Sequence, residues 1–193
     1  KDAERAAKRL RAVPINEPVK LNEQVSARFR GAGHILGSSS IAVTVRENGT
    51  ERIIVFSGDL GQWDKPLIND PHPFDRADYV VIESTYGDRK HDHHQNIETK
   101  LAEIINAAHE AGGNVIIPAF AIERSQELLY YLGKLRRKKL IPPVPVFLDS
   151  PMAIRATETF ARHKEILDAE AQRMIAAGND PIEFPGLHYT RTA

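Results

Sequence analysis

A change in hydrophobic periodicity near residue 86 is the feature that most restricts how this chain can fold. Before this point, residues 25–30 and 41–46 alternate apolar and polar side chains, as half-buried strands do. After residue 90, amphipathic helix patterns alternate with short apolar runs, an order that predicts parallel strands with helical crossovers. We therefore expect an α/β protein with antiparallel strands up to residue 86 and a doubly wound region after it.

The first region contains further strand signals. Residues 52–56 (RIIVF) follow the sequence ENGTE, whose Asn-Gly pair favours a two-residue hairpin turn. The runs IIVFSGDLG and YVVIESTYG are nearly continuous and rich in β-branched residues, so we expect both strands to be buried on both faces. Each run ends in one carboxylate, Asp59 in the first and Glu83 in the second. Upstream, residues 2–12 have helix-forming composition, and Pro14 ends that helix.

The second region contains three helix patterns, at residues 96–113, 121–139 and 150–163, with apolar strand runs at 114–120 and 144–150 between them. The first pattern ends in a glycine suited to the position after a helix. The third begins with Ser-Pro, an N-cap followed by proline at the first helical position. The residues expected on the buried faces of the first two helices are Ile97, Leu101, Ile104, Ile105 and Ala108, then Ile122, Ser125, Leu128, Leu129, Leu132 and Leu135.

The composition excludes several classes of protein. The chain has 26 basic and 26 acidic residues, so its overall charge predicts no polyanionic partner, and nucleic-acid binding would need a local patch. It has no cysteine, which excludes disulfides and thiolate metal ligands and fits a reducing compartment. No run approaches the about 18 apolar residues of a membrane span, and no signal peptide is visible. We expect a cytoplasmic protein without membrane association. Because the sequence opens without Met and stops at GLHYTRTA, we also expect it to be an internal fragment.

Two side chains in glycine-flanked loops are the first candidates for chemistry. His34 lies in GAGHILG and Asp59 in SGDLG, at the ends of strands that a hairpin connects. Each alone has an ordinary explanation, as a loop histidine or a turn-forming aspartate beside glycine. Together, a neutral imidazole and a carboxylate are typical ligands of zinc or manganese. The pair therefore predicts part of a metal site whose other ligands lie elsewhere.

The motifs AGHILGSS, FSGDLG and ESTYGDR, in this order and spacing, resemble the metallo-β-lactamase/β-CASP ribonucleases. That family includes the endonuclease of eukaryotic pre-mRNA 3′-end processing and its bacterial and archaeal relatives. The stretches IIPAFAIERSQELLYYL and FLDSPMA are similar to the β-CASP insertion of the family. The resemblance covers the chain from about residue 19 to its end. It implies a partial αββα sandwich in residues 1–86, followed by a Rossmann-like parallel α/β β-CASP region in residues 87–193.

The resemblance also implies roles for individual residues. His34 becomes a ligand of one zinc ion, Asp59 the carboxylate that bridges two zinc ions, and Glu83 the first acidic signature residue of the β-CASP region. Two metal ions held close together can activate a water molecule and stabilise charge on a phosphate. The expected activity is zinc-dependent hydrolysis of RNA phosphodiester bonds, with Asp59 and Glu83 as catalytic residues. We expect the substrate to be single-stranded RNA, bound with little sequence preference.

The chain departs from the family pattern in its metal ligands. The H-x-H-x-D-H motif and two downstream histidines of the family are absent, so we expect no cleavage by this chain alone. The sequence HDHH, residues 91–94, has the wrong order and follows Glu83, and we interpret it as a solvated loop.

Two strand–helix junctions, PAFAIERS and DSPMAIR, are candidates for binding phosphate, because helix N-termini favour anions. The candidate RNA contacts are Arg124, Ser125, Ser150 and Arg155 at these junctions, and Tyr86 and Arg89 beside the expected site. Helix capping and solvent exposure explain each of them individually, so both interpretations stay open. The basic run KLRRKK ends a helix, where cations favour the helix dipole, and we do not assign it to RNA.

Two other functions fit parts of the sequence. A non-catalytic paralogue could serve as a scaffold or RNA-binding subunit, although His34, Asp59 and Glu83 are retained. A small-molecule hydrolase of the same superfamily, such as a thioesterase or lactonase, shares the His and Asp loops but has no reason to carry ESTYGDR. The motifs do not separate endonuclease from exonuclease action. Half of a sandwich leaves one apolar face without its partner sheet, so the chain can form a homodimer.

Overall fold

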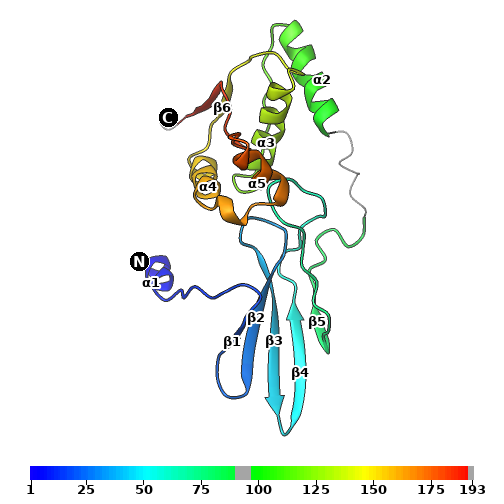
Figure 1. Ribbon diagram of the computed structural model, residues 1–193, viewed down its shortest axis with the longest axis vertical. Helices are drawn as coiled ribbons and strands as arrows, with labels where there is room; N and C mark the ends of the chain where they lie inside the picture. Colours follow the sequence, from blue (N-terminus) through cyan, green and yellow to red (C-terminus); the bar gives the residue numbers. More distant parts are fainter. Residues whose placement is uncertain (90–96, 191–193) are drawn as a thin grey trace. The chain divides into compact units, whose positions relative to one another are not determined.

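The computed structural model describes residues 1–89 and 97–190 (Figure 1). The chain divides into two compact units. The first comprises Lys1–Gly33, Gly37–Gly61 and Asp70–Glu83; the second comprises His34–Leu36, Gln62–Asn69 and Ser84–Ala193. Two short segments, His34–Leu36 and Gln62–Asn69, thus belong to the second unit although their neighbours in sequence belong to the first.

The described strands of the first unit form a five-stranded sheet in the order β1-β2-β3-β4-β5. Their bounds are β1 Pro18–Lys20, β2 Val25–Gly31, β3 Ser39–Glu47, β4 Thr50–Phe56 and β5 Tyr79–Val81. The strands β1 to β4 pair antiparallel with their neighbours, as the alternating patterns predict. The predicted hairpin turn joins β3 to β4, and both its residues, Asn48 and Gly49, have positive φ angles of 50° and 76°. This combination is the one that a two-residue hairpin turn of type I′ requires.

The strand β5 corrects the expectation of a wholly antiparallel first region, because it pairs parallel with β4, with Ile54 opposite Tyr79. Its burial is also contrary to expectation. The residues Tyr79, Val80, Val81 and Ile82 are each 54% to 63% exposed, and in β4 only Val55 is buried. The prediction that both strands are buried on both faces is therefore wrong. Their β-branched residues favour strand formation, whereas burial requires a further layer packed on the sheet.

The N-terminal helix is shorter than expected. The helix α1 covers Asp2–Ala7 instead of residues 2–12, and none of its residues is buried. A short helix without a packed face has little tertiary stabilisation, because most helix stability in proteins comes from such packing.

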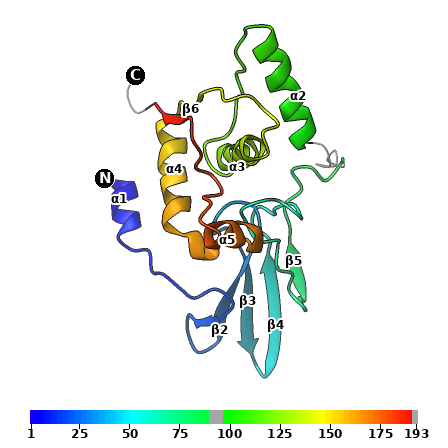
Figure 2. The ribbon, with the colours of Figure 1, turned by 45° about the horizontal axis from the view of Figure 1, so that its top comes forward.

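The second unit contains the predicted helices, seen in Figure 2. They are α2 Ile97–Glu110, α3 Arg124–Arg137 and α4 Pro151–Arg162, followed by a 3-10 turn η1 Lys164–Ile166 and a further helix α5 Ala169–Ala176. Ser150 is the predicted N-cap of α4, and its side chain accepts a hydrogen bond from the Ala153 amide at 3.2 Å. The strands β6 Val146–Leu148 and β7 Leu187–Tyr189 pair in parallel, which confirms a mixed α/β fold; the motifs do not indicate α5 or β7.

Residues 114–120 correct another expectation. The apolar run NVIIPAF predicts a strand, but in the described part of the chain it pairs with no other strand. Ile116 is 91% exposed and Phe120 is 85% exposed. A strand needs a neighbour for its backbone hydrogen bonds, and β6 pairs with β7 instead.

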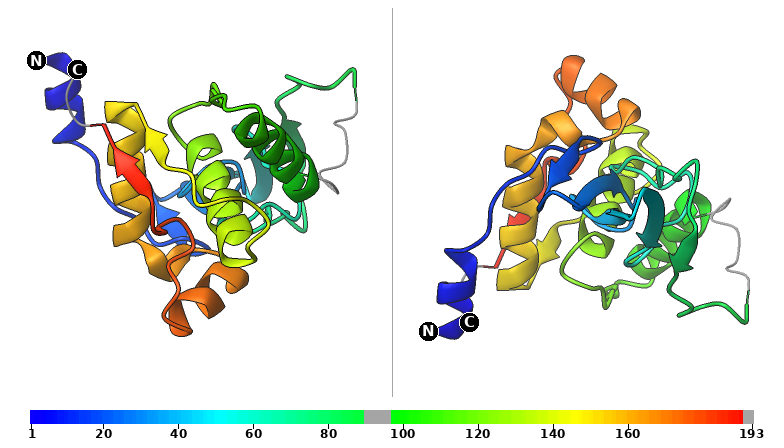
Figure 3. Two further views of the ribbon diagram at one scale, coloured as in Figure 1. Left: turned by 90° about the horizontal axis from the view of Figure 1, so that it is seen from above. Right: turned by 90° about the horizontal axis from the view of Figure 1, so that it is seen from below.

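The helix α3 lies at the centre of the second unit, between α2 and α4 (Figure 3). Its buried partners come from α2, α4 and α5, from the loops before α4 and before and after α5, and from the segment 62–69. The core residues are Leu67, Leu101, Ile105, Leu129, Tyr130, Leu132, Leu135, Ile141, Phe160, Leu167, Ala171, Ile182 and Phe184. Two residues expected in the core are exposed instead, Ile104 at 55% and Ile122 at 44%. Only the stripe of α2 that faces α3 is covered, and Ile122 precedes the first turn of α3.

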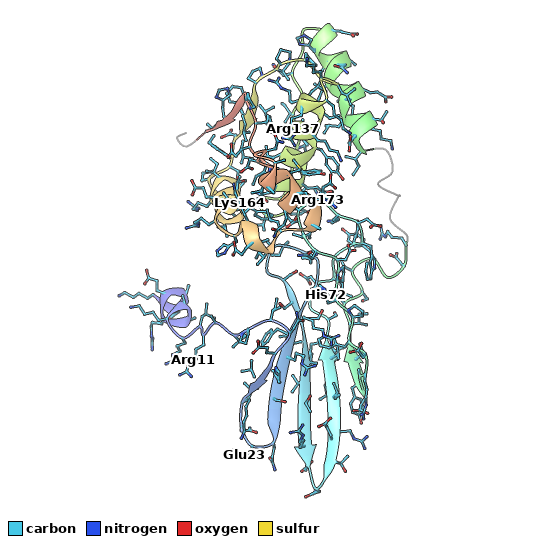
Figure 4. The ribbon with its side chains drawn as sticks, viewed as in Figure 1. Arg11, Glu23, His72, Arg137, Lys164 and Arg173 are labelled. Atoms are coloured by element: carbon cyan, nitrogen blue, oxygen red, sulfur yellow. The ribbon has the colours of Figure 1, made fainter. Side chains whose placement is uncertain are left out.

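Charged side chains from the end of α3 bind the protein itself. Lys134 lies 2.9 Å and Lys138 lies 2.8 Å from the carboxylate of Glu98. Arg136 donates to the carbonyl oxygens of Pro142, Val144 and Pro185. Nearby, Arg137 donates to the carbonyl oxygen of Asp180, whose carboxylate lies 2.6 Å from Lys164 (Figure 4). The basic run KLRRKK therefore contributes to the tertiary structure of this unit.

Candidate metal centre and its supporting loops

The loop after β4 carries Asp59 and is tightly constrained. Gly58 has a φ of 59°, and a Cβ atom there would lie 3.3 Å from the carbonyl oxygen of Ser39. Glycine is therefore required both by the backbone conformation and by the close approach of β3. The hydroxyl of Ser40 donates to the carbonyl oxygen of Ser57 at 2.6 Å, which ties the start of the loop to the neighbouring strand.

Glu83 binds the same loop from the end of β5. Its carboxylate accepts a hydrogen bond from the Leu60 amide at 2.8 Å, and its own amide donates to the hydroxyl of Ser57 at 3.0 Å. The carboxylate of Glu83 is thus held against the loop that carries Asp59, within the first unit. The parallel pairing of β4 with β5 is the cause, because parallel strands deliver their carboxyl ends to the same edge of a sheet.

His34 belongs to the second unit, where its segment is half-buried. Gly33 and Gly37 bracket the segment, with φ angles of 63° and 81° that glycine adopts readily. The side chain of Leu36 packs against the core of the second unit. The convergence of His34 with Asp59 on one metal ion, which the sequence predicts, remains a prediction.

Another histidine near the first motif escaped sequence reasoning. His72 lies beside the end of β2 (Figure 4), and its amide donates to the carbonyl oxygen of Gly31 at 2.9 Å. A Cβ atom on Gly31 would lie 3.5 Å from the Nδ1 atom of His72. The sequence around His72 matches none of the recognised motifs, so no local signal marks it.

A buried carboxylate at the start of α3 also escaped sequence reasoning. Glu123 is 5% exposed, and its Oε2 atom accepts a hydrogen bond from the Leu36 amide at 3.2 Å. Burial raises the pKa of the Glu123 carboxyl to about 7. The positive charge of Lys65 lowers this pKa, and the negative charge of Glu127 raises it further. An acidic residue at a helix N-terminus is ordinary, so the sequence contains no sign that this one is buried.

The predicted RNA contacts all lie in the second unit, at the N-terminal ends of α3 and α4 or in the ESTYGDR motif. Ser125 and Ser150 serve local structure: the Ser125 hydroxyl donates to the carbonyl oxygen of Phe120 at 2.8 Å, and Ser150 caps α4. Arg155 is exposed, and Arg124 lies 3.8 Å from the carboxylate of Glu127.

Tyr86 and Arg89 lie within the ESTYGDR motif. Tyr86 is exposed, and the guanidinium of Arg89 lies 5.9 Å from the centre of the Tyr86 ring while pairing with Asp88 at 3.0 Å. Residues 91–94, the HDHH sequence, lie outside the described residues. The arrangement of Tyr86 and Arg89 offers an aromatic face and a cation to a ligand, so both stay candidate contacts.

Among the described residues, few donor atoms are grouped so that they could hold a metal ion. Within residues 1–89 and 97–190, no three His, Asp or Glu side chains form a group that could hold a metal ion. The imidazole of His34 and the carboxylate of Asp59 are chemically suited to zinc, and a complete site needs further ligands.

Over residues 1–89 and 97–190, no helix combines the length and the apolar character needed to cross a membrane.

A sheet with Asp59 and Glu83 after its two parallel strands, followed by an α/β unit, agrees with the mixed α/β fold that the three motifs predict for a metallo-β-lactamase protein with a β-CASP region. The comparisons with known proteins agree with this class. Residues 125–193 match the model of the Beta-Casp domain. The chain belongs to the β-CASP family of metallo-β-lactamase proteins. Members of this family depend on metal ions.

Three curated relatives illustrate the range of the family. A ribonuclease of Thermus thermophilus is 36% identical over 186 residues, which is 96% of this chain and 42% of that protein. The transcription termination factor FttA of Methanosarcina mazei is 35% identical over 177 residues, 88% of this chain and 27% of that protein. An RNase J-like protein of Methanocaldococcus jannaschii is 32% identical over 185 residues, 94% of this chain and 42% of that protein. The chain therefore spans less than half the length of these relatives.

Proposed function

We propose that the natural protein containing this chain is a ribonuclease that hydrolyses phosphodiester bonds of single-stranded RNA with two zinc ions. The observation that carries the proposal is the joint placement of Asp59 and Glu83 at the parallel edge of one sheet, in a chain of the β-CASP family. The relatives from Thermus thermophilus and Methanocaldococcus jannaschii are named as a ribonuclease and an RNase J-like protein, which supports RNA as the substrate.

Each residue has a role that follows from its chemistry. The imidazole of His34 would bind one zinc ion, and the carboxylate of Asp59 would bridge both ions. When bound, such an ion pair supplies an activated water and stabilises charge on the phosphate. Glu83 fixes the Asp59 loop through Leu60 and Ser57, and we assign its carboxylate to proton transfer.

The exposed side chains of the second unit suit a single-stranded substrate. Tyr86 offers an aromatic face on which a base can stack, while Arg89, Arg124 and Arg155 offer cations for the phosphate backbone. We place the protein in the cytoplasm, because a cysteine-free chain has no need of an oxidising compartment. A thioesterase or lactonase is less well supported, because residues 125–193 match the Beta-Casp domain.

Substitution of the two metal ligands in the natural protein tests the proposal. We expect His34→Ala and Asp59→Ala to abolish cleavage of single-stranded RNA and to lower zinc content, measured by elemental analysis of the same samples. Cleavage at the parent rate by Asp59→Ala with its zinc intact would show that the assignment is wrong. A parent protein that binds zinc but cuts no RNA would favour the small-molecule hydrolase, and one that binds RNA without zinc would favour the non-catalytic paralogue.

A further inference from the structure

Glu123 has a backbone conformation that is rare for a residue with a side chain. Its φ and ψ angles are 67° and −60°, and the amide of Arg124 donates to the carbonyl oxygen of Ile122 at 2.9 Å. These angles and this hydrogen bond define a γ-turn of the rarer, strained kind, centred on Glu123. Such strained conformations persist where the surroundings hold them, and they cluster at functional positions.

The environment of the Glu123 side chain is also energetically unfavourable. It is buried, and its Oε1 atom has no hydrogen-bond partner among the described residues. The Oε2 atom reaches across 87 residues of sequence to accept the hydrogen bond of the Leu36 amide. The strain and the burial together place one carboxylate oxygen on the segment that carries His34.

That segment lies between two points of rotation and is anchored at Leu36. Gly33 and Gly37 lie on either side of it, in conformations that glycine adopts freely. Leu36, two residues after His34, makes two anchoring contacts: its side chain packs against the core of the second unit, and its amide donates to the carboxylate of Glu123. The side-chain contact holds the segment on the unit, whereas the directional hydrogen bond restricts its rotation.

We propose that Glu123 is a positioning residue, which fixes the orientation of the His34 imidazole by holding the Leu36 amide. The inference rests on the proposed function, in which His34 is a metal ligand. Loss of a residue that orients a metal ligand from outside the coordination sphere typically lowers metal affinity about 10- to 100-fold. Loss of Glu123 therefore weakens metal binding without removing any ligand.

Two substitutions in the natural protein separate positioning from folding. Glu123→Gly removes the carboxylate and also relieves the strained backbone, since glycine adopts a φ of 67° readily. Glu123→Gln keeps the length of the side chain and an oxygen that can accept the same hydrogen bond. Glu127→Gln is the matched control, because this buried carboxylate lies one helical turn further along and pairs with Arg124.

Two measurements decide the outcome, and one of them is independent of activity. Hydrogen exchange of the Leu36 amide reports the anchor directly, and zinc affinity from a competition titration reports its effect on His34. We expect Glu123→Gly to melt no lower than the parent, to exchange the Leu36 amide at least about 10-fold faster, and to bind zinc about 10-fold more weakly. In Glu123→Gln we expect the exchange rate of the Leu36 amide and the zinc affinity to stay within about twofold of the parent values. In Glu127→Gln both quantities should equal those of the parent.

The inference is wrong if Glu123→Gly exchanges and binds zinc as the parent does. If Glu123→Gly folds poorly, Glu123→Asp is used in its place, because the shorter side chain keeps the charge but cannot reach the Leu36 amide. Exchange of that amide and zinc affinity equal to the parent values in Glu123→Asp would also overturn the inference. Failure of the proposed function looks different. In that case His34→Ala leaves zinc content unchanged, while the exchange of the Leu36 amide still shows whether Glu123 anchors the segment.

Discussion

Glu83 combines two tasks that one substitution can separate. Its carboxylate holds the Leu60 amide at 2.8 Å, and the same group is proposed to act in proton transfer. In Glu83→Gln the side-chain oxygen still accepts that hydrogen bond, so the loop and its zinc are retained while the acidic proton is lost. We expect RNA cleavage by the natural protein to fall about 100-fold or more. Glu83→Ala should lose zinc as well, and cleavage by Glu83→Gln at the parent rate would exclude a role in proton transfer.

Substitution of Gly58 measures how strongly the Asp59 loop depends on glycine at this position. Gly58→Ala places an L-residue at a φ of 59° and a methyl group 3.3 Å from the carbonyl oxygen of Ser39. We expect a loss of about 2 kcal/mol in the free energy of unfolding, measured in urea. Gly49→Ala is the control, because its φ is also positive but no atom lies within 4 Å of the added group. If Gly49→Ala costs more than Gly58→Ala, close approach to β3 is not the constraint.

The raised pKa of the Glu123 carboxyl group predicts that the stability of the folded chain depends on pH. Its pKa is about 7 in the folded chain against an ordinary value of 4.5. Between these two values the folded chain retains a proton that the unfolded chain has lost. The contribution of Glu123 to stability is therefore fully present below about pH 4.5 and is lost as the pH rises to about 7, by roughly 3 kcal/mol at most. Urea melts of the parent and Glu123→Gln across this range check the prediction, since the Gln variant should lack this component of the slope.

At the scale of elements, the N-terminus of α4 distinguishes capping from RNA binding. Ser150 accepts a hydrogen bond from the Ala153 amide, so Ser150→Ala should cost about 1 kcal/mol in the free energy of unfolding. Ser150→Asp keeps the cap and should restore that stability, whereas its negative charge would repel a phosphate at the same place. Stability is measured by urea melts and affinity by titration with single-stranded RNA. Parent-like stability of Ser150→Ala would refute the capping role, and weaker RNA binding by Ser150→Asp would support a phosphate contact there.

At the scale of the whole molecule, exposed apolar side chains predict self-association of the 193-residue chain. Residues 79–82 form an exposed apolar edge at β5, and edge strands of this kind pair with other chains. We expect the isolated chain at about 100 μM to have a mass of at least a dimer in light scattering after size exclusion. Val81→Lys should shift it towards monomer, because a charge on an edge strand opposes pairing. A monomeric parent at that concentration would contradict the prediction.

Some features of this protein follow from short stretches of sequence because neighbours along the chain decide them. The Asn48-Gly49 turn, the Ser150 cap and the helical patterns of α2, α3 and α4 depend on backbone preferences and local hydrogen bonds, and the structure confirms them. The motifs AGHILGSS, FSGDLG and ESTYGDR are likewise sufficient to identify a β-CASP protein. The same motifs contain Asp59 and Glu83, and the Glu83 carboxylate binds the amide of Leu60 next to Asp59, whereas their roles as site residues stay a prediction.

Other features depend on contacts between residues that are far apart in sequence, so no local pattern predicts them. The parallel pairing of β4 with β5 brings Glu83 to the Asp59 loop, although the sequence pattern suggests antiparallel strands. The runs at 79–82 and 114–120 are equally apolar, yet they are exposed because no described element packs over them. Glu123 reads as an ordinary acid at a helix N-terminus, and its burial against Leu36 arises from a contact 87 residues away. Local preference determines which elements form, whereas burial and pairing depend on which distant partners are present.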